Sequence, residues 1–202
     1  IIIATTKLKK DDKIIRIAKK KKLLFFKGEE NDLVKRVINA AKKNKLKYII
    51  QVTSDNIFFD KDIFGTLLKK FESKHYDFVS NSLNSNFPIG SDIRIFSLNT
   101  LIRSSKFIKG KARQHTCYYF LKFPKKIKSY NLKASKEYKR PHYRLTLDFL
   151  SDFVLIKKIV EKLGNKYFSL KKIISFLDKN KNISKINSHL PNKLKIPAYN
   201  EK

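Results

Sequence analysis

The sequence predicts a three-layer α/β/α fold built around a mainly parallel sheet. Short apolar runs rich in β-branched residues alternate along the chain with segments of helical period, which is typical of βαβ units. The length of 202 residues suits one domain, and a hydrophobic content of 42% with 16 Phe can fill a core of that size. Because the sequence shows no internal repeat and no low-complexity linker, we expect a single domain over residues 1–202.

Strands and helices alternate in the first part of the chain. The expected elements are a strand at 1–6, a helix at 10–19, a strand at 23–26, a helix at 29–43, a strand at 48–53 and a helix at 61–73. The strands are short apolar runs such as IIIATT and LLFF. The helix at 29–43 carries its apolar residues on one face, and Glu29 and Glu30 predict an acidic first turn, as the helix dipole prefers.

Further strands are expected at 77–81, 92–97 and 144–148, followed by two helices. Ser151 is expected to cap a helix that stops at Gly164. The side chains expected to point inward from that helix are Phe153, Ile156, Ile159, Val160 and Leu163. The last helix is expected to start near Ser169.

The chain is strongly basic, with 47 Lys and Arg against 17 Asp and Glu and a formal charge of +30. Such a charge suits a polyanion, but 40 of the basic residues are Lys and seven are Arg, whereas base-edge recognition favours Arg. Lys is absent from 48–60, 75–105 and 140–156, which hold six Asp and four Arg. No nucleic-acid-binding motif is visible, so we expect no specific nucleic-acid partner. The basic stretch 122–140 is expected to be a solvated connection rather than a polyanion-binding loop.

Several classes of protein are excluded by composition. One Cys rules out a disulfide framework and a Cys-based zinc site, and four scattered His do not replace it. No apolar run approaches the roughly 18 residues of a membrane span and no signal-peptide pattern opens the chain, so we expect no membrane partner and a cytoplasmic location. The chain opens inside an apolar run at Ile1, so we expect a further segment upstream.

Two acids lie where α/β sheets bind ligands, beyond the carboxyl ends of strands. Asp55 follows the strand at 48–53, and Asp148 closes the strand at 144–148. Paired carboxylates suit Mg²⁺, which fills its other positions with water and phosphate oxygens. Taken singly, each Asp is more often a helix cap or a turn residue, but both stand in Lys-free segments, so the sequence indicates a metal pair.

A polar segment from Ser80 to Gly90 precedes the strand at 92–97. It contains Pro88, and Asp92 and Arg94 follow on one side of the alternating strand. Such a loop beside a sheet edge suits closure over a polar substrate such as a sugar, and an ordinary surface connection is equally consistent with the sequence.

The order of these segments resembles the cytidylyltransferase family. The likeness runs through nearly the whole chain and comprises IIIATT, KGEENDLVKR, QVTSDNIFFD, YDFVSNSLNSNFPIGSDIRIFSL, ARQHT, HYRLTLDFLSDFVLIKKI, YFSLKKIISFL and SKINSH. The nearest likeness is to the spore-coat polysaccharide biosynthesis protein F type, a relative of acylneuraminate and 3-deoxy-manno-octulosonate cytidylyltransferases. The resemblance implies a Rossmann-like nucleotide-diphospho-sugar transferase fold. It also implies transfer of CMP from CTP to a sugar acid or related sugar of the cell envelope, with release of pyrophosphate.

The resemblance further implies roles for individual residues. Asp55 and Asp148 match the acids of the family's T-G-D-x-P and L-T-V-D-x-P-E-D turns and would hold Mg²⁺, with Arg144 as the catalytic basic residue before the second acid. The implied nucleotide-binding residues are Ala4, Thr5, Thr6, Gly28, Asp32 and Arg36. The implied sugar-binding residues are Asn81, Pro88, Gly90, Asp92, Arg113 and His115.

The chain also departs from the family pattern. It begins after the family's segment Q-A-R-x-G-S-x-R-L-P-G-K, the strand and loop that hold the triphosphate. The residues that follow the two acids differ from the family pattern, at Asn56 and Ile57 and at 149–151. Gln114 replaces the Glu of R-E-H. The sequence is therefore consistent with a fragment of an active enzyme and with a non-catalytic remnant. It is also consistent with a glycosyltransferase of the same fold and with a basic module that binds anionic polymers. The sequence leaves the oligomeric state open, with a homodimer as one possibility.

Overall fold

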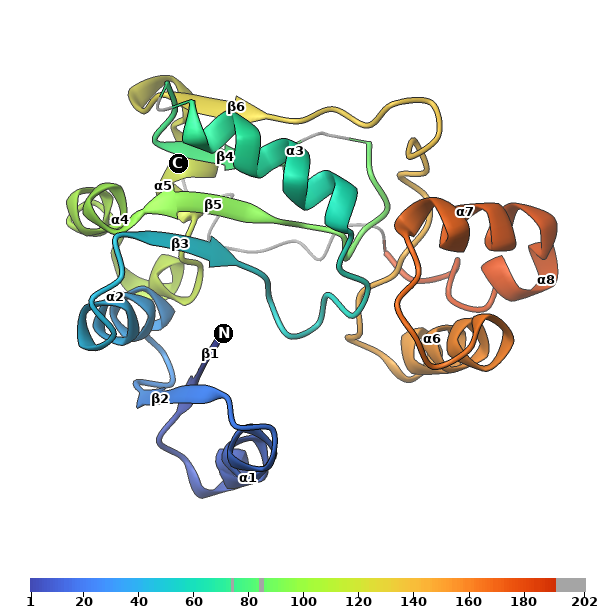
Figure 1. Cartoon of the computed structure of the whole chain (residues 1–202), viewed down its shortest axis with the longest axis horizontal. Coiled ribbons are helices and arrows are strands. Elements are labelled where there is room, and N and C mark those ends of the chain that lie inside the picture. Colours follow the sequence, from blue (N-terminus) through green and yellow to red (C-terminus); the bar gives the residue numbers. More distant parts are fainter. Residues whose placement is uncertain (74, 84–85, 192–202) are drawn as a thin grey trace. The chain divides into compact units, whose positions relative to one another are not determined.

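The computed structural model describes residues 1–73, 75–83 and 86–191. The chain is α/β with parallel strand pairs, as predicted, and its described residues fall into two compact units (Figure 1). Unit 1 comprises residues 1–49 and 96–128, and unit 2 comprises residues 50–95 and 129–191. No helix in the described part of the chain is both long and apolar enough to cross a lipid bilayer.

Unit 1 is built on a two-stranded parallel sheet, β1 and β2, with helices packed on it. Its elements are β1 (Ile2–Thr6), the 3-10 helix η1 (Lys9–Asp11), α1 (Asp12–Lys20), β2 (Leu24–Gly28), α2 (Leu33–Lys43), α4 (Leu98–Ser105), η2 (Gly110–Gln114), α5 (Tyr118–Lys122) and η3 (Pro124–Lys126). The register pairs Ile2 with Leu24 and ends with Thr6 beside Gly28. This β1-α1-β2 order confirms the predicted βαβ start.

Unit 2 carries most of a four-stranded sheet with the order β3-β5-β4-β6. The remaining elements are β3 (Tyr48–Gln51), α3 (Lys61–Glu72), β4 (Phe78–Ser80), β5 (Arg94–Ser97), β6 (Ser129–Asn131), α6 (Leu150–Leu163), α7 (Leu170–Lys179) and α8 (Lys181–Ser184). β4 and β6 are parallel, with Phe78 beside Ser129. β3, β4 and β5 all lie inside the ranges predicted for them.

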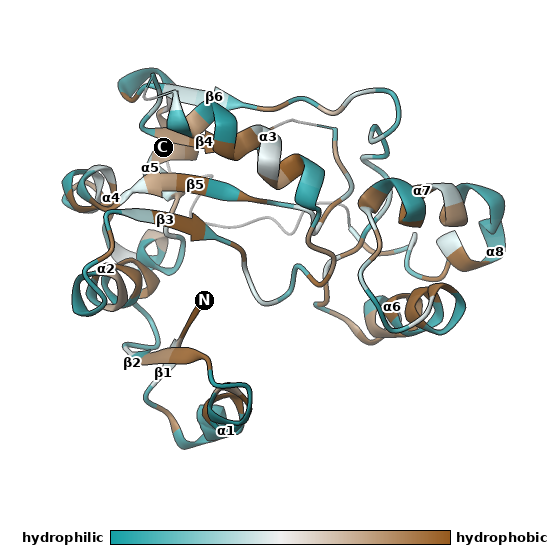
Figure 2. Cartoon of the chain, in the orientation of Figure 1, coloured by the Kyte–Doolittle hydropathy of each residue, from teal (hydrophilic) through white to brown (hydrophobic). Residues whose placement is uncertain are grey.

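One apolar cluster forms the core of unit 2. Its fully buried members include Leu67 of α3, Val79 of β4, Ile159 of α6 and Ile173 of α7. In Figure 2, α6 and α7 each carry hydrophobic and hydrophilic residues on different sides, as helices that cover a core do. Removing these side chains from water is the main force that holds the helices in place.

Residues 144–148 do not form the predicted strand. They make single bridges instead, Arg144 in parallel with Ile89 and Thr146 in antiparallel with Asn56. Because each pairing lasts one residue and involves a different partner, no continuous ladder forms.

The start of α2 also differs from the prediction. The helix has no acid in its first turn, because Glu29 and Glu30 lie before it. Asp32 is the N-cap residue, and its carboxylate accepts a hydrogen bond from the Lys35 N–H at 2.8 Å. The helix therefore begins later than residue 29, at the point where a side chain satisfies its free N–H groups.

The expected capping role of Ser151 in α6 is wrong. The N-cap residue is Phe149, whose N–H donates to the carboxylate of Asp152 at 3.0 Å. Asp152 is buried at this point of the helix, whereas Phe153, which was expected to point inward, is 50% exposed. Of the other residues predicted to point inward, Ile156 and Ile159 are buried, and Val160 and Leu163 are partly buried.

The ends of the last helices follow the prediction. α6 stops at Gly164, whose φ of +91° suits glycine, and Ser169 caps α7 by accepting from the Lys172 N–H at 3.3 Å. The sequence did not predict α4, α5, α8 or β6, and β6 lies in the basic stretch 122–140 that was expected to be a solvated connection.

Candidate functional site

Two segments of unit 2, one with Asp55 and one ending at Asp148, pair through their main chains. Asp55 follows β3 in a turn in which the Asn56 N–H donates to the Thr53 carbonyl at 3.1 Å. Asn56 of this turn forms an antiparallel bridge with Thr146. Next to the bridge, the Leu147 N–H donates to the Asp55 carbonyl at 3.0 Å. Asp55 thus lies opposite Leu147, the residue before Asp148.

The carboxylate of Asp55 has an unsatisfied oxygen. Its Oδ1 is buried and has no hydrogen-bond partner among the described residues. A buried carboxylate oxygen is costly unless a donor or a cation meets it. Carboxylate oxygens are the protein ligands that Mg²⁺ prefers, and it fills its other positions with water and phosphate oxygens. The donor set therefore fits Mg²⁺.

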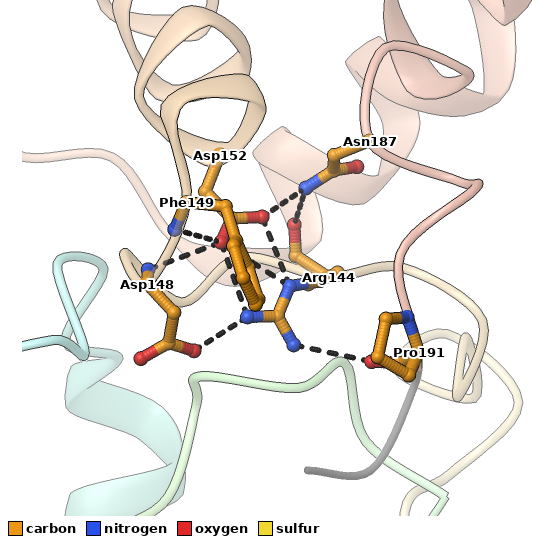
Figure 3. A network of polar contacts seen from close by, with 6 residues as sticks. All are labelled: Arg144, Asp148, Phe149, Asp152, Asn187 and Pro191. Atoms are coloured by element: carbon orange, nitrogen blue, oxygen red, sulfur yellow. Dashed lines mark hydrogen bonds and ion pairs between the residues drawn. The ribbon is translucent and has the colours of Figure 1, made fainter.

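Arg144 lies at the centre of a polar network beside Asp148 (Figure 3). Its side chain is 2% exposed, and its Nη2 donates to Asp148 Oδ2 at 2.5 Å. Its Nε donates to Asp152 Oδ1 at 2.9 Å, and its Nη2 also reaches Asp152 Oδ2 at 3.1 Å. The guanidinium lies 5.3 Å from the centre of the Phe149 ring. Arg144 thus joins two carboxylates, and its role toward substrate phosphate stays a prediction.

Asp152 is fully buried and surrounded by protein hydrogen-bond donors. Burial opposes its ionisation, but hydrogen bonds from Arg144, Asn187 and the main chain outweigh that effect and lower the pKa of its carboxyl. The carboxylate of Asp152 thus pairs with a buried cation. Removing one member of such a pair costs about 3–5 kcal/mol, because the other charge stays buried without a partner.

Asn81 is buried directly after β4, and its side chain holds the main chain of the predicted sugar-side loop. Its Nδ2 donates to the Ser91 carbonyl at 2.9 Å, and its Oδ1 accepts from the Ile93 N–H at 2.7 Å. The Ser91 hydroxyl in turn donates to the Pro88 carbonyl at 2.6 Å. Asn81 therefore shapes the segment that carries Pro88 and Gly90. Residues 84 and 85 of that loop lie outside the described residues.

Asp92 links this loop to the turn of Asp55. The Asn56 side chain donates to the Asp92 carbonyl at 3.1 Å, and the Asp92 carboxylate pairs with Arg94 Nη2 at 2.8 Å. The pair confirms that Asp92 and Arg94 lie on one side of the strand start. Burial raises the pKa of Asp92, Arg94 opposes the rise, and the nearby charge of Asp55 adds to it. Asp55, Asp92 and Asp148 thus come from three loops of unit 2.

The predicted nucleotide-binding residues all lie in unit 1. Thr6 stands beside Gly28 in the parallel register, with Ala4 and Thr5 earlier on β1. The hydroxyls of Thr5 and Thr6 both donate to Asp11 Oδ2, which lowers the pKa of Asp11.

Arg36 and Arg113 meet the loop between β2 and α2. Arg36 Nη1 donates to the Glu29 carbonyl at 2.6 Å, and its Cγ would lie 2.7 Å from a Cβ on Gly28. Arg113 Nε donates to Asp32 Oδ2 at 2.7 Å. His115, which was expected beside the sugar, follows η2 and is half-buried. Unit 1 therefore brings together Thr6 with Gly28 and Asp32 with Arg113.

Sequence analysis missed Asp11, Asp152 and Asn187. Asp152 stands at the third position of its helix, where an acid after an N-cap residue is a recognisable signal. Asp11 and Asn187 belong to no such pattern, since their partners are set by the tertiary fold.

Comparisons with known proteins bear on the fold and the family. Residues 1–187 match the family described as Cytidylyltransferase. The chain is 29% identical over 194 residues to an uncharacterized protein of Methanocaldococcus jannaschii, covering 96% of this chain and 79% of the relative. It is 25% identical over 185 residues to the spore coat polysaccharide biosynthesis protein SpsF of Bacillus subtilis, covering 89% of this chain and 75% of that protein. A solved cytidylyltransferase of Leptospira borgpetersenii is similar with a TM-score of 0.83 and 29% identity, covering 90% of this chain and 77% of that one.

Proposed function

This chain belongs to the cytidylyltransferase family, and from that premise we propose that it transfers CMP from CTP to a sugar acid or related sugar and releases pyrophosphate. The observation that carries the proposal is the main-chain pairing of Asp55 with Leu147, the residue before Asp148, together with the buried, unpartnered Oδ1 of Asp55. A divalent cation that binds substrate phosphates is usually coordinated by one or two carboxylates with a free oxygen.

Asp55 and Asp148 would hold Mg²⁺. When bound, Mg²⁺ neutralises phosphate charge and lowers the pKa of the attacking hydroxyl. Arg144 keeps Asp148 oriented and balances the charge of the acids around it. The main chain of the Asp55 turn and the segment before Asp148 hold each other by hydrogen bonds, so the two acids need little reorganisation.

The two substrates are proposed to bind at two sets of residues. In unit 1, the ends of β1 and β2, with Asp32 and Arg36, are proposed to bind the nucleotide, and Arg113 and His115 to bind the sugar. In unit 2, the loop that Asn81 holds, with Gly90 and Asp92, is proposed to select the sugar. The name of the Bacillus subtilis relative supports a role in polysaccharide biosynthesis. A cytoplasmic location and a homodimer stay predictions, the latter open to sedimentation analysis.

The test is Asp55→Asn and Asp148→Asn in the full-length protein, assayed for pyrophosphate release from CTP with a panel of sugar acids. We expect kcat to fall about 10²-fold or more in each variant, since each loses a carboxylate that would hold the cation against the phosphates. Asp62→Asn, an exposed acid in the first turn of α3, is the matched control and should keep full activity. Full activity in both site variants would contradict the metal pair. Sugar transfer without pyrophosphate release would identify a glycosyltransferase instead.

A further inference from the structure

We propose that Asp152 and Asn187 are positioning residues for the metal pair: they hold Arg144 in the one orientation that fixes the carboxylate of Asp148. The inference rests on the proposed function, which makes Asp148 a metal ligand. Neither residue is needed to touch substrate: Asn187 acts through Arg144, and Asp152 acts both through Arg144 and through the Asp148 N–H.

Asp152 cannot reach a ligand, because its side chain is 0% exposed and both of its oxygens are occupied. Oδ1 accepts from Arg144 Nε at 2.9 Å and from Asn187 Nδ2 at 2.7 Å. Oδ2 accepts from the Arg144 Nη2 at 3.1 Å and from the main-chain N–H groups of Asp148 and Phe149, each at 3.0 Å. A carboxylate met by donors on both oxygens is a rigid support for the guanidinium.

Asp148 is held at two points as a result. Its N–H is fixed by Asp152 Oδ2, and its own Oδ2 is fixed by Arg144 Nη2 (Figure 3). A side chain with one carboxylate oxygen bound loses rotational freedom, and the other oxygen then keeps one direction. Asp148 is 26% exposed, in contrast to Arg144 and Asp152, so its Oδ1 is the group of this network left for a cation.

Asn187 closes the network from the segment that follows α8. It is 2% exposed, and its Nδ2 donates to the Arg144 carbonyl at 2.9 Å as well as to Asp152. In the same segment, the Pro191 carbonyl accepts from Arg144 Nη1 at 3.3 Å. The segment after α8 therefore binds both the main chain and the side chain of Arg144.

The test measures binding of Mn²⁺ alone to the full chain, followed by the loss of the free-ion paramagnetic resonance signal. We expect Asn187→Ala and Asp152→Asn each to weaken Mn²⁺ binding about ten-fold or more, as substitutions behind a metal ligand do. Two matched controls remove similar groups away from Asp148: Asn180→Ala, whose amide donates to the Phe176 carbonyl, and Asp178→Asn, whose carboxylate pairs with Arg140. Both controls should bind Mn²⁺ like the wild type.

Urea unfolding of every variant separates positioning from folding. Asn187→Ala and Asn180→Ala are chosen because each removes one small side chain, so Asn187→Ala keeps the inference testable if Asp152→Asn does not fold. Wild-type Mn²⁺ affinity in Asn187→Ala would overturn the inference while leaving the metal pair intact, provided that Asp55→Asn still abolishes binding. Equal losses in Asn187→Ala and Asn180→Ala would also overturn it. No Mn²⁺ binding by the wild type would remove both this inference and the proposed metal pair.

Discussion

Gly90 packs so closely on Thr146 that a Cβ on Gly90 would stand 2.4 Å from the Thr146 main-chain nitrogen. The φ of Gly90 is +87°, in the region that favours glycine. At the preceding residue, the Ile89 N–H donates to the Tyr143 carbonyl at 2.9 Å and the Ile89 carbonyl accepts from the Leu145 N–H at 2.7 Å. The proposed sugar-side loop is therefore joined by its main chain to the segment that ends at Asp148.

Gly90→Ala should disturb both stability and activity. We expect a loss of about 1–3 kcal/mol in unfolding free energy, from the positive φ and from the forced movement of the 145–146 backbone. Urea denaturation measures the stability, and CTP-dependent pyrophosphate release measures the activity. Gly110→Ala is the matched control, because Gly110 also has a positive φ of +53° but nothing lies within 4 Å of its added Cβ. Equal effects of the two substitutions would contradict the role of the close contact.

Asp32→Ala should loosen α2 more than Asp32→Asn. Asp32 caps the helix and also accepts from Arg113, so alanine removes both hydrogen bonds whereas asparagine can keep the cap. Losing the cap costs about 1 kcal/mol, and losing the second bond adds to it. Amide hydrogen exchange of α2 measures the local opening free energy. Faster exchange in Asp32→Asn than in Asp32→Ala would run against this expectation.

Acid should remove the contribution of Asp178 to stability. Arg140 hydrogen bonds lower the pKa of Asp178, burial opposes the fall, and the Tyr143 hydroxyl at 2.6 Å lowers it further. A carboxyl whose pKa is lower in the folded state stabilises above its unfolded pKa of about 3.9 and loses that effect as the pH falls below it. Urea midpoints of the wild type and Asp178→Asn should therefore differ most at neutral pH and converge below about pH 4. A gap that widens in acid would disprove this linkage.

The charge of +30 should give weak, sequence-independent binding to DNA. Such binding depends on counterion release, so we expect the affinity to fall about 10³-fold or more between 50 and 200 mM salt. Filter binding with two scrambled duplexes measures it, and Asp55→Asn should leave it unchanged. Tight binding with this same steep salt dependence would instead favour the basic binding module, and a preference for one duplex would contradict the expectation.

The sequence by itself determined the alternation of strands and helices and several of the boundaries. These features depend on neighbours along the chain: the period-two spacing that pairs Asp92 with Arg94, the glycine at the end of α6, and Ser169 at the start of α7. The order of the motifs also carried the family, because it spans the chain from residue 1 to residue 187.

Only the tertiary structure decided what surrounds the acids. Sequence periodicity assigned Arg144 to a strand and Ser151 to a cap, but Arg144 pairs with Ile89 for one residue and is enclosed by Asp152, Asn187 and Pro191. The last two partners stand more than forty positions away along the chain. Hydrogen bonds over such separations form because the packed core brings the segments together, and a local pattern of apolar and polar residues carries no record of them.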